Sequence, residues 1–332
     1  MSDARTLLRE FWKAPTIAAA ASLGVADHMA DATDADSLAG VTGVNPAALA
    51  RLLRALATLG LVEDRGEGRF ALTDEGQLLR SDHPQSIRGM ARHIGTMLIP
   101  AFQQIEACVR SGAPPEGILH GPHGFAELLA NPTDAHIFNQ SMVDSSRRIA
   151  ARAADAYDFS GFACLIDVGG GYGAVLATLL QRHPQVEGAI LDMAHARDGA
   201  LAYLEAEGVA SRARFIEGSF FDPLPNDADC YLLKYIIHDW NDGYATRIIE
   251  RVGEAVAAND ATLILIERIL PERFVEDGEQ QGAVASDLTM MLWDGCERTE
   301  AQFAALLRKG NLALTRAVPI GEAHYVIEAR RA

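Results

Sequence analysis

The chain has 332 residues, of which 49% are hydrophobic, and this length and composition predict two domains, or one large domain with an appendage. Because 45 Asp and Glu outnumber 29 Lys and Arg, the net charge of -16 repels phosphate backbones and argues against a nucleic-acid partner. The sequence has neither a run of about eighteen apolar residues nor a leader pattern at its start, so we expect a cytoplasmic protein without a membrane span.

The first hundred residues predict helices followed by a small hairpin. Asn45-Pro46 begins a helix whose leucines recur on one face until Gly60 ends it. Apolar stretches at 61–64 and 69–72 flank a glycine-containing turn, which is typical of a β-hairpin. Helices followed by such a hairpin form a winged-helix pattern, and we assign it to residues 1–100.

A winged helix can bind DNA or hold two copies of a chain together. Residues 1–90 contain nine Lys and Arg against twelve Asp and Glu, a net charge of -3, whereas a DNA-binding module needs the opposite sign. Ala18, Leu23 and Val25 add apolar surface that a lone small domain cannot hide. We therefore predict a homodimerisation module rather than a transcriptional regulator.

The four cysteines are widely scattered, and none forms a C-x-x-C pair. This spacing predicts neither a disulfide scaffold nor a cysteine zinc site. We expect buried or half-buried thiols at Cys108, Cys164, Cys230 and Cys296.

Residues 101–160 predict helices and loops, with a long helical stretch over 134–157, and we interpret them as a linker and part of a pocket wall. From residue 161 the pattern changes to short apolar runs that alternate with helical stretches, at 165–168, 188–191, 213–216, 230–233 and 262–266. This alternation predicts an α/β fold with a doubly wound, Rossmann-like sheet over 161–332. Its ligand should lie at the carboxyl ends of the strands.

A glycine-rich loop, DVGGGYG at 167–173, follows the first of these strands and precedes a helix over 174–182. Glycines there let the backbone turn sharply and approach a ligand closely. Asp192 ends the second strand, where a carboxylate can accept hydrogen bonds from both ribose hydroxyls of an adenosine. At this point NAD and S-adenosylmethionine fit equally well, and a purely structural loop with a capping Asp192 stays open.

The stretch 227–242, DADCYLLKYIIHDWND, distinguishes between these cofactors. Together with D-V-G-G-G-x-G, the L-D of the second strand, F-F-D-P-L-P, I-E-R-I-L-P and E-R-T-E, it resembles the plant and bacterial small-molecule O-methyltransferases, which include caffeic acid, flavonoid and anthracycline-type enzymes. The resemblance covers the whole chain, because that family also begins with a winged-helix dimerisation domain. It implies transfer of a methyl group from S-adenosylmethionine to a hydroxyl of a small aromatic acceptor.

The resemblance also implies roles for individual residues. His238 is the general base, and Glu267 and Glu297 flank it. The residues around S-adenosylmethionine are Gly169, Gly171, Asp192, Ser219, Phe220 and Lys234, and those on the acceptor side are Asn139, Met142, Asp239 and Met290. No metal is implied. Three residues depart from those usual in the family and leave the adenine contacts and the pocket shape open, namely Ser219, Tyr172 and Cys296.

The role of His238 also has a physical basis. A methyl sulfonium is already an activated electrophile, so the protein must align an oxygen with it and remove the proton. Because a phenol has a pKa of about 10 and imidazole one of about 6.5, full prior deprotonation costs about 5 kcal/mol. We therefore expect proton loss to be coupled to methyl transfer, with a neighbouring carboxylate stabilising the imidazolium.

Several alternatives stay open beside this interpretation. A nicotinamide dehydrogenase is favoured only by the glycine loop, and it leaves the H-D-W motif unexplained. Some relatives in bacterial pigment pathways hydroxylate or decarboxylate their substrates, and the intact His238 argues against that chemistry here. Glu267 and Glu297 can also form ordinary salt bridges, and Met142 and Met290 can simply fill a core.

Overall fold

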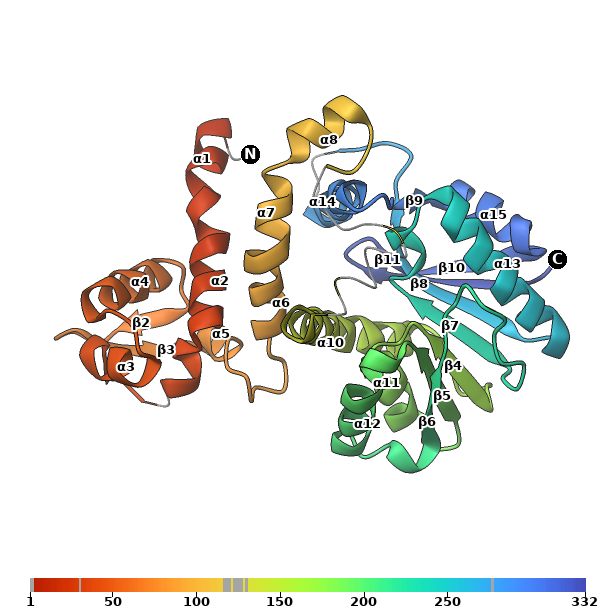
Figure 1. Ribbon diagram of the computed structural model, residues 1–332, viewed down its shortest axis with the longest axis horizontal. Helices are drawn as coiled ribbons and strands as arrows, with labels where there is room; N and C mark the ends of the chain where they lie inside the picture. The colour runs from red at the N-terminus through yellow and green to blue at the C-terminus, as the bar shows by residue number, and fades with distance from the viewer. Residues whose placement is uncertain (1–2, 30, 116–120, 122–127, 129–130, 276–277) are drawn as a thin grey trace. The chain divides into compact units, whose positions relative to one another are not determined.

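The computed structural model describes residues 3–29, 31–115, 121, 128, 131–275 and 278–332 (Figure 1). It divides into two compact units. Unit 1 comprises Met1–Gln103 and Thr133–Ser145, and unit 2 comprises Gln104–Pro132 and Ser146–Ala332. The segment 101–160, which the sequence predicts to be a linker and part of a pocket wall, contributes residues to both units, as does its long helix α10 (Pro132–Ala156), and its predicted role stays a prediction.

Unit 1 consists of short helices and a three-stranded sheet. Besides its part of α10, its helices are α1 (Ala4–Arg9), α2 (Lys13–Leu23), α3 (Ala35–Thr42), α4 (Pro46–Thr58), α5 (Asp74–Gln77), α6 (Arg88–His93) and α7 (Ile99–Phe102). The 3-10 turns η1 (Glu10–Trp12) and η2 (Val25–His28) and the π-helical turn η3 (Ile94–Leu98) join some of them.

The predicted helix and hairpin of this unit are confirmed. Asn45 begins α4, because its side chain accepts a hydrogen bond of 3.0 Å from the amide of Ala48. The strands β2 (Val62–Asp64) and β3 (Arg69–Leu72) are antiparallel, and leucines of α3 and α4 form a core with Phe70. A third strand, β1 (Thr33–Asp34), was not predicted, because two residues carry no periodic signal.

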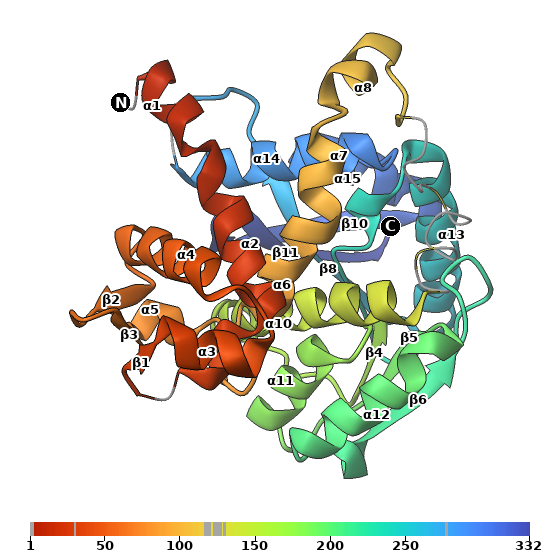
Figure 2. The same ribbon diagram turned by 60° about the vertical axis from the view of Figure 1, so that its left-hand side comes forward.

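The sheet of unit 2 has the order β10-β11-β8-β7-β4-β5-β6, with β9 pairing beside β8 (Figures 1 and 2). Its strands are β4 (Cys164–Val168), β5 (Glu187–Asp192), β6 (Ala213–Glu217), β7 (Cys230–Lys234), β8 (Thr262–Leu270), β9 (Arg298–Thr299), β10 (Leu312–Gly321) and β11 (His324–Arg331). The five predicted strands, β4 to β8, are confirmed and pair in parallel. The antiparallel strands β10 and β11 were not predicted. Many side chains of β10 are exposed or half-buried, so this strand lacks a continuous apolar run.

Helices of unit 2 lie on both faces of this sheet. Besides its part of α10, the helices of unit 2 among the described residues are α8 (Ile105–Ser111), α11 (Ala174–Arg182), α12 (Arg197–Ala206), α13 (Asp242–Asn259), α14 (Gly278–Leu292) and α15 (Glu300–Leu307). Short turns are η4 (Ala194–Ala196), η5 (Ala210–Arg212), η6 (Ile237–Asp239) and η7 (Arg308–Gly310).

Alternate residues of each strand fill two separate cores. Leu165 and Ile264 pack with α11 and α12 on one face, whereas Ile166 and Leu265 pack with α13 and α15 on the other (Figure 1). The sheet is therefore doubly wound, as predicted, and the loops that follow its parallel strands meet at one edge. Among the helices that the structure describes, none combines the length and apolar character needed to cross a lipid bilayer.

Candidate functional site

The loop after β4 is a backbone cradle built by glycines. Gly169, Gly171 and Gly173 have φ angles of 72°, 56° and 84°, in the left-handed region that most side chains avoid. At Gly169 a Cβ atom would lie 2.5 Å from Cδ1 of Ile236, so a larger residue does not fit without displacing that side chain. The loop leads directly into α11, whose first amide groups have no partner within the helix and suit an anionic or polar ligand.

Asp192 ends β5, and its carboxylate faces this loop. Its Oδ2 accepts a hydrogen bond of 2.7 Å from the amide of Gly171, and its Oδ1 accepts one of 2.7 Å from the amide of Met193. Burial raises the pKa of Asp192, and the two amides partly offset that effect. Each oxygen keeps a second lone pair, so the carboxylate can hold the loop and also accept a ligand hydroxyl.

Two buried charges stand at the ends of β4 and β7. Asp167 is 2% exposed and Lys234 is 8% exposed, and Nζ of Lys234 donates a hydrogen bond of 2.8 Å to Oγ of Ser146. Burial raises the pKa of Asp167 to about 7 and lowers that of Lys234 to about 8, and the opposite charge partly counteracts each shift. Within the described residues, Oδ2 of Asp167 is buried without a hydrogen-bond partner, which is a suitable place for a donor group of a ligand.

Ser219 and Phe220 follow β6. Oγ of Ser219 accepts a hydrogen bond of 3.2 Å from the amide of Phe221. The ring centroids of Phe220 and Trp240 are 5.7 Å apart. A Cβ atom at Gly169 would lie 3.4 Å from Cε1 of Phe220. Phe220 is thus next to the glycine loop, while the predicted contact of Ser219 with adenine stays a prediction.

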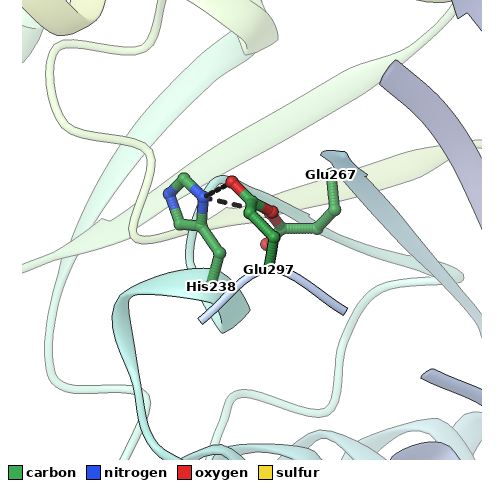
Figure 3. A group of neighbouring side chains, drawn as sticks. All are labelled: His238, Glu267 and Glu297. Atoms are coloured by element: carbon green, nitrogen blue, oxygen red, sulfur yellow. Dashed lines mark hydrogen bonds and ion pairs between the residues drawn. The ribbon is translucent and has the colours of Figure 1, made fainter. Parts of the chain in front are cut away.

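His238 lies in the turn η6 that follows β7, and it is 6% exposed. Its Nδ1 is 2.8 Å from Oε1 of Glu297 and 3.8 Å from Oε2 of Glu267 (Figure 3). Glu267 belongs to β8 and Glu297 precedes β9, so the fold brings together three residues that are far apart in sequence. These are the three residues that the sequence analysis assigned to catalysis.

The two glutamates accept hydrogen bonds from different groups. Oε1 of Glu267 accepts hydrogen bonds from the amides of Ile236 and Ile237, at 3.1 and 2.9 Å, and so supports the turn that carries His238. Oε1 of Glu297 accepts a hydrogen bond of 2.6 Å from Ser286. The predicted apolar run at 262–266 places Glu267 just after a strand, which is wrong. The strand β8 continues to Leu270, because it pairs with β11 beyond that point.

The carboxylates change the basicity of the imidazole. Burial opposes the charged form, but the charges of Glu297, Glu267 and Asp239 together raise the pKa of His238 to about 9. Burial also acts against ionisation of Glu297, yet His238 and Ser286 outweigh it and lower its pKa. The carboxylates therefore favour the imidazolium form of His238, with Nδ1 donating its hydrogen bond to the carboxylate of Glu297.

Arg298 is a supporting residue that the sequence analysis missed. It is buried, and its guanidinium donates to the carbonyl oxygens of Ile237 and Trp240, at 3.0 and 2.9 Å, and to Asp242 at 2.8 Å. Arg298 therefore fixes both ends of the turn around His238. The signal in the sequence was its place directly after Glu297 in E-R-T-E. Its burial, which requires several hydrogen-bond acceptors, is seen in the structure.

The segment before Glu297 contacts the same turn through its backbone. The amide of Cys296 donates a hydrogen bond of 2.9 Å to the carbonyl oxygen of His238, and a Cβ atom at Gly295 would collide with that oxygen. The amide of Glu297 in turn donates to Asp287 at 3.0 Å. This segment holds Glu297 against His238.

The residues assigned to the acceptor lie in different places. Oδ1 of Asp239 is 3.5 Å from Nε2 of His238, and Met290 is half-buried on α14. Asn139 and Met142 belong to α10 in unit 1, and Nδ2 of Asn139 is buried without a partner among the described residues. All four roles stay predictions.

The donor atoms of His238, Glu267 and Glu297 lie within 4.8 Å of one another, a spacing that also suits a metal ion. In a mechanism with His238 as the base, Nδ1 donates its hydrogen bond to Glu297, so the same nitrogen does not bind a metal ion. The absence of a metal stays a prediction. Of the cysteines, Cys108 and Cys230 are buried and Cys164 and Cys296 are half-buried, all as free thiols, which confirms the expectation.

Comparisons with known proteins show the family to which the chain belongs. Residues 102–311 match a family model described as an O-methyltransferase domain, and residues 6–82 match an O-methyltransferase dimerisation domain. A mitomycin biosynthesis 6-O-methyltransferase of Streptomyces lavendulae is 33% identical over 98% of this chain and 93% of that protein. The crystal structure of LaPhzM superimposes with a TM-score of 0.92 and 30% identity over the whole of both chains.

Two further relatives bear on the ligand and on the chemistry. The O-methyltransferase NcsB1 from neocarzinostatin biosynthesis, solved with S-adenosylmethionine and 2-hydroxy-5-methyl naphthoic acid, has a TM-score of 0.79 and 29% identity, over 100% of this chain and 99% of that one. The aclacinomycin 10-hydroxylase RdmB of Streptomyces purpurascens is 32% identical over 74% of this chain and 67% of that protein.

Proposed function

The chain belongs to the O-methyltransferase family, and from that premise we propose that it methylates a hydroxyl of a small aromatic compound, with His238 as the general base. The enzyme is an S-adenosylmethionine-dependent O-methyltransferase, and relatives in the family act in natural-product biosynthesis. The observation that carries the proposal is the buried His238 whose Nδ1 is bonded to Glu297, an arrangement that leaves Nε2 as the atom to accept a proton.

The residues at the glycine loop fit the cofactor. The cradle of Gly169 and Gly171 provides amides without side chains in the way, and Asp192 provides acceptors for the ribose hydroxyls. The unpartnered Oδ2 of Asp167 suits the ammonium group of a methionine moiety, and Lys234 balances its charge from β7. When bound, the cofactor supplies a sulfonium-activated methyl group.

His238 is well matched to a phenol. Because the pKa of His238 is raised to about 9, it lies closer to a phenol pKa of about 10 than that of an ordinary imidazole, for which full proton transfer costs about 5 kcal/mol. The cost is that His238 must first lose its own proton at neutral pH. Nε2 of His238 then takes the proton of the acceptor hydroxyl while the oxygen of that hydroxyl gains the methyl group. Glu297 and Glu267 stabilise the resulting imidazolium.

The aromatic acceptor is supported by the relatives, one of which was solved with a hydroxynaphthoic acid. We also propose a homodimer formed through residues 1–100. A dimerisation-domain model matches residues 6–82, and the first helices expose Leu7, Leu8 and Phe11, at 59%, 76% and 79% of their surfaces. Such apolar exposure favours a second copy as its cover.

The test is incubation with methyl-labelled S-adenosylmethionine and a panel of phenols, hydroxynaphthoic acids, hydroxyphenazines and hydroxyquinones. We expect label in at least one aromatic product, and its loss in the His238→Gln variant. A second candidate, hydroxylation, is favoured by the similarity to the aclacinomycin hydroxylase. A product that gains an oxygen atom and no label would replace the proposal with that chemistry.

A further inference from the structure

Tyr235 stands directly before the turn that carries His238, and its backbone is unusual. Its φ angle is 57°, in the left-handed region that residues with large side chains rarely adopt. Its amide still bonds to the carbonyl oxygen of Ile266 at 3.1 Å, and the next two amides converge on Glu267. Glycine would make this bend without strain, so the presence of a strained tyrosine points to a role for its ring.

The ring of Tyr235 stacks on the imidazole of His238. The two centroids are 4.9 Å apart, and the planes are inclined by 22°. Nζ of Lys234 lies 4.2 Å from the same tyrosine ring, and the guanidinium carbon of Arg268 lies 5.4 Å from it. Cations are attracted to the electron-rich face of an aromatic ring. Protonated His238 is therefore a third cation next to the ring of Tyr235, besides Lys234 and Arg268.

The hydroxyl of Tyr235 is anchored on β11. It is hydrogen-bonded to Nε2 of His324, whose Nδ1 lies 3.1 Å from the carbonyl oxygen of Gly321. That carbonyl requires the proton of His324 on Nδ1, so Nε2 accepts from the tyrosine hydroxyl. Burial lowers the pKa of His324 to about 4 and raises the pKa of Tyr235, so both groups are neutral near pH 7.

We propose that Tyr235, anchored by His324, is a positioning residue of the methyl transfer, because its ring fixes the plane in which the imidazole of His238 presents Nε2 to the acceptor. This inference rests on the proposed role of His238. One hydrogen bond from Nδ1 to Glu297 sets one direction of the imidazole, and the stacked ring sets its plane. Among the described residues, the other charged groups that act on His238, Tyr235 or His324 include Glu267, Asp239, Lys234, Arg268 and Glu322.

The deciding variant is Tyr235→Asn, because asparagine tolerates the left-handed region and removes the ring. We expect turnover of the best acceptor in the panel to fall by about 10- to 100-fold, with the affinity for S-adenosylhomocysteine changed less than about twofold. In proton NMR spectra of the S-adenosylhomocysteine complex, the downfield Nδ1 proton of His238, assigned by its loss in His238→Gln, should broaden. Tyr231→Phe is the matched control. It removes the hydroxyl of a tyrosine on β7, which donates a hydrogen bond of 2.6 Å to the carbonyl oxygen of Pro225. This variant should change neither turnover nor the Nδ1 resonance.

Combination with His238→Gln separates the two claims. If Tyr235 acts through His238, adding Tyr235→Asn to His238→Gln costs little further turnover. A full additional loss, or unchanged turnover and an unchanged Nδ1 resonance in Tyr235→Asn alone, would overturn the inference and leave the role of His238 standing. Unchanged turnover in His238→Gln would instead overturn the proposed function.

Two milder variants keep the test decisive if Tyr235→Asn does not fold. Tyr235→Phe and His324→Gln each change the hydroxyl bond while keeping an aromatic ring on His238. We expect similar losses of about threefold to tenfold in turnover from both, with S-adenosylhomocysteine affinity retained. No loss in either variant would contradict the anchoring by His324.

Discussion

The glycine loop and the His238 turn lie at the same edge of the sheet in unit 2 and are built in different ways. The loop owes its shape to local backbone geometry, with one carboxylate from the neighbouring strand, Asp192, holding it. His238 is held by residues from β8, β9 and the segment before β9. Binding of the cofactor and activation of the acceptor should therefore respond to different substitutions.

The largest expected effect is on the His238 side. Replacing His238 with Gln should lower turnover by about a hundredfold to ten-thousandfold, the usual contribution of a positioned general base, while affinity for S-adenosylhomocysteine stays nearly unchanged. Steady-state kinetics and calorimetry would measure both. An acceptor that is already ionised at neutral pH should lose less, and equal losses for weak and strong acids would remove the base role from His238.

The next effect separates the loop from the turn. Asp192→Ala should weaken binding of S-adenosylhomocysteine by about 1.5 to 3 kcal/mol for each lost charge-assisted hydrogen bond, and turnover at saturating cofactor should change far less. Asp192→Asn, which keeps the shape and one acceptor oxygen, is the matched control and should lose less affinity. Calorimetry that finds unchanged affinity in Asp192→Ala would remove this residue from the cofactor site.

A smaller effect concerns the charge beside His238. Because His238 must lose its proton before it acts, kcat/KM should rise with pH until about 9. Glu297→Gln removes the negative charge that raises this pKa, so the rise should move to lower pH by roughly one unit. Glu254→Gln, at an exposed carboxylate on α13, should leave the profile in place, and an unmoved profile in Glu297→Gln would contradict the assignment.

The same pKa has a consequence for stability. The pKa of folded His238 lies above its ordinary value of 6.5, so its ion pair with Glu297 contributes fully below that value. The contribution is lost as the pH rises through about 9. Thermal unfolding of the wild type and of His238→Gln at pH 6 and pH 10 would show it, with the stability difference between the two proteins smaller at pH 10.

The smallest effect is expected at Cys296, the residue before Glu297. Its contact with His238 is made by its amide, at 2.9 Å, so the thiol is not needed for that bond. Cys296→Gly should leave turnover within about twofold and cost about 0.5 to 1 kcal/mol of unfolding free energy through added chain entropy. Cys296→Ala controls for the loss of the thiol alone. A large loss of turnover in both variants would mean that the side chain itself supports the site.

The local features of the site could be predicted because their signals lie within short stretches. The strands β4, β5, β7 and β8 are largely buried on both faces and therefore appear as continuous apolar runs, whereas the edge strand β6 is half-buried or exposed. The glycine loop follows β4 directly, and Asp192 ends β5. The H-D-W motif and the two glutamates were recognised by resemblance to a family, not from periodicity. The strands β10 and β11 carry mixed burial patterns, and they gave no comparable signal.

What the sequence by itself determined was the class of fold, the cofactor loop and the identity of His238, Glu267 and Glu297 as candidates. Only the tertiary structure decided how they meet. The pairing of β8 with β11 places Glu267 inside a strand, Arg298 closes the turn from β9, and β11 brings His324 to Tyr235. Contacts between segments so far apart depend on strand order and register, and neither leaves a local periodic signal in the chain.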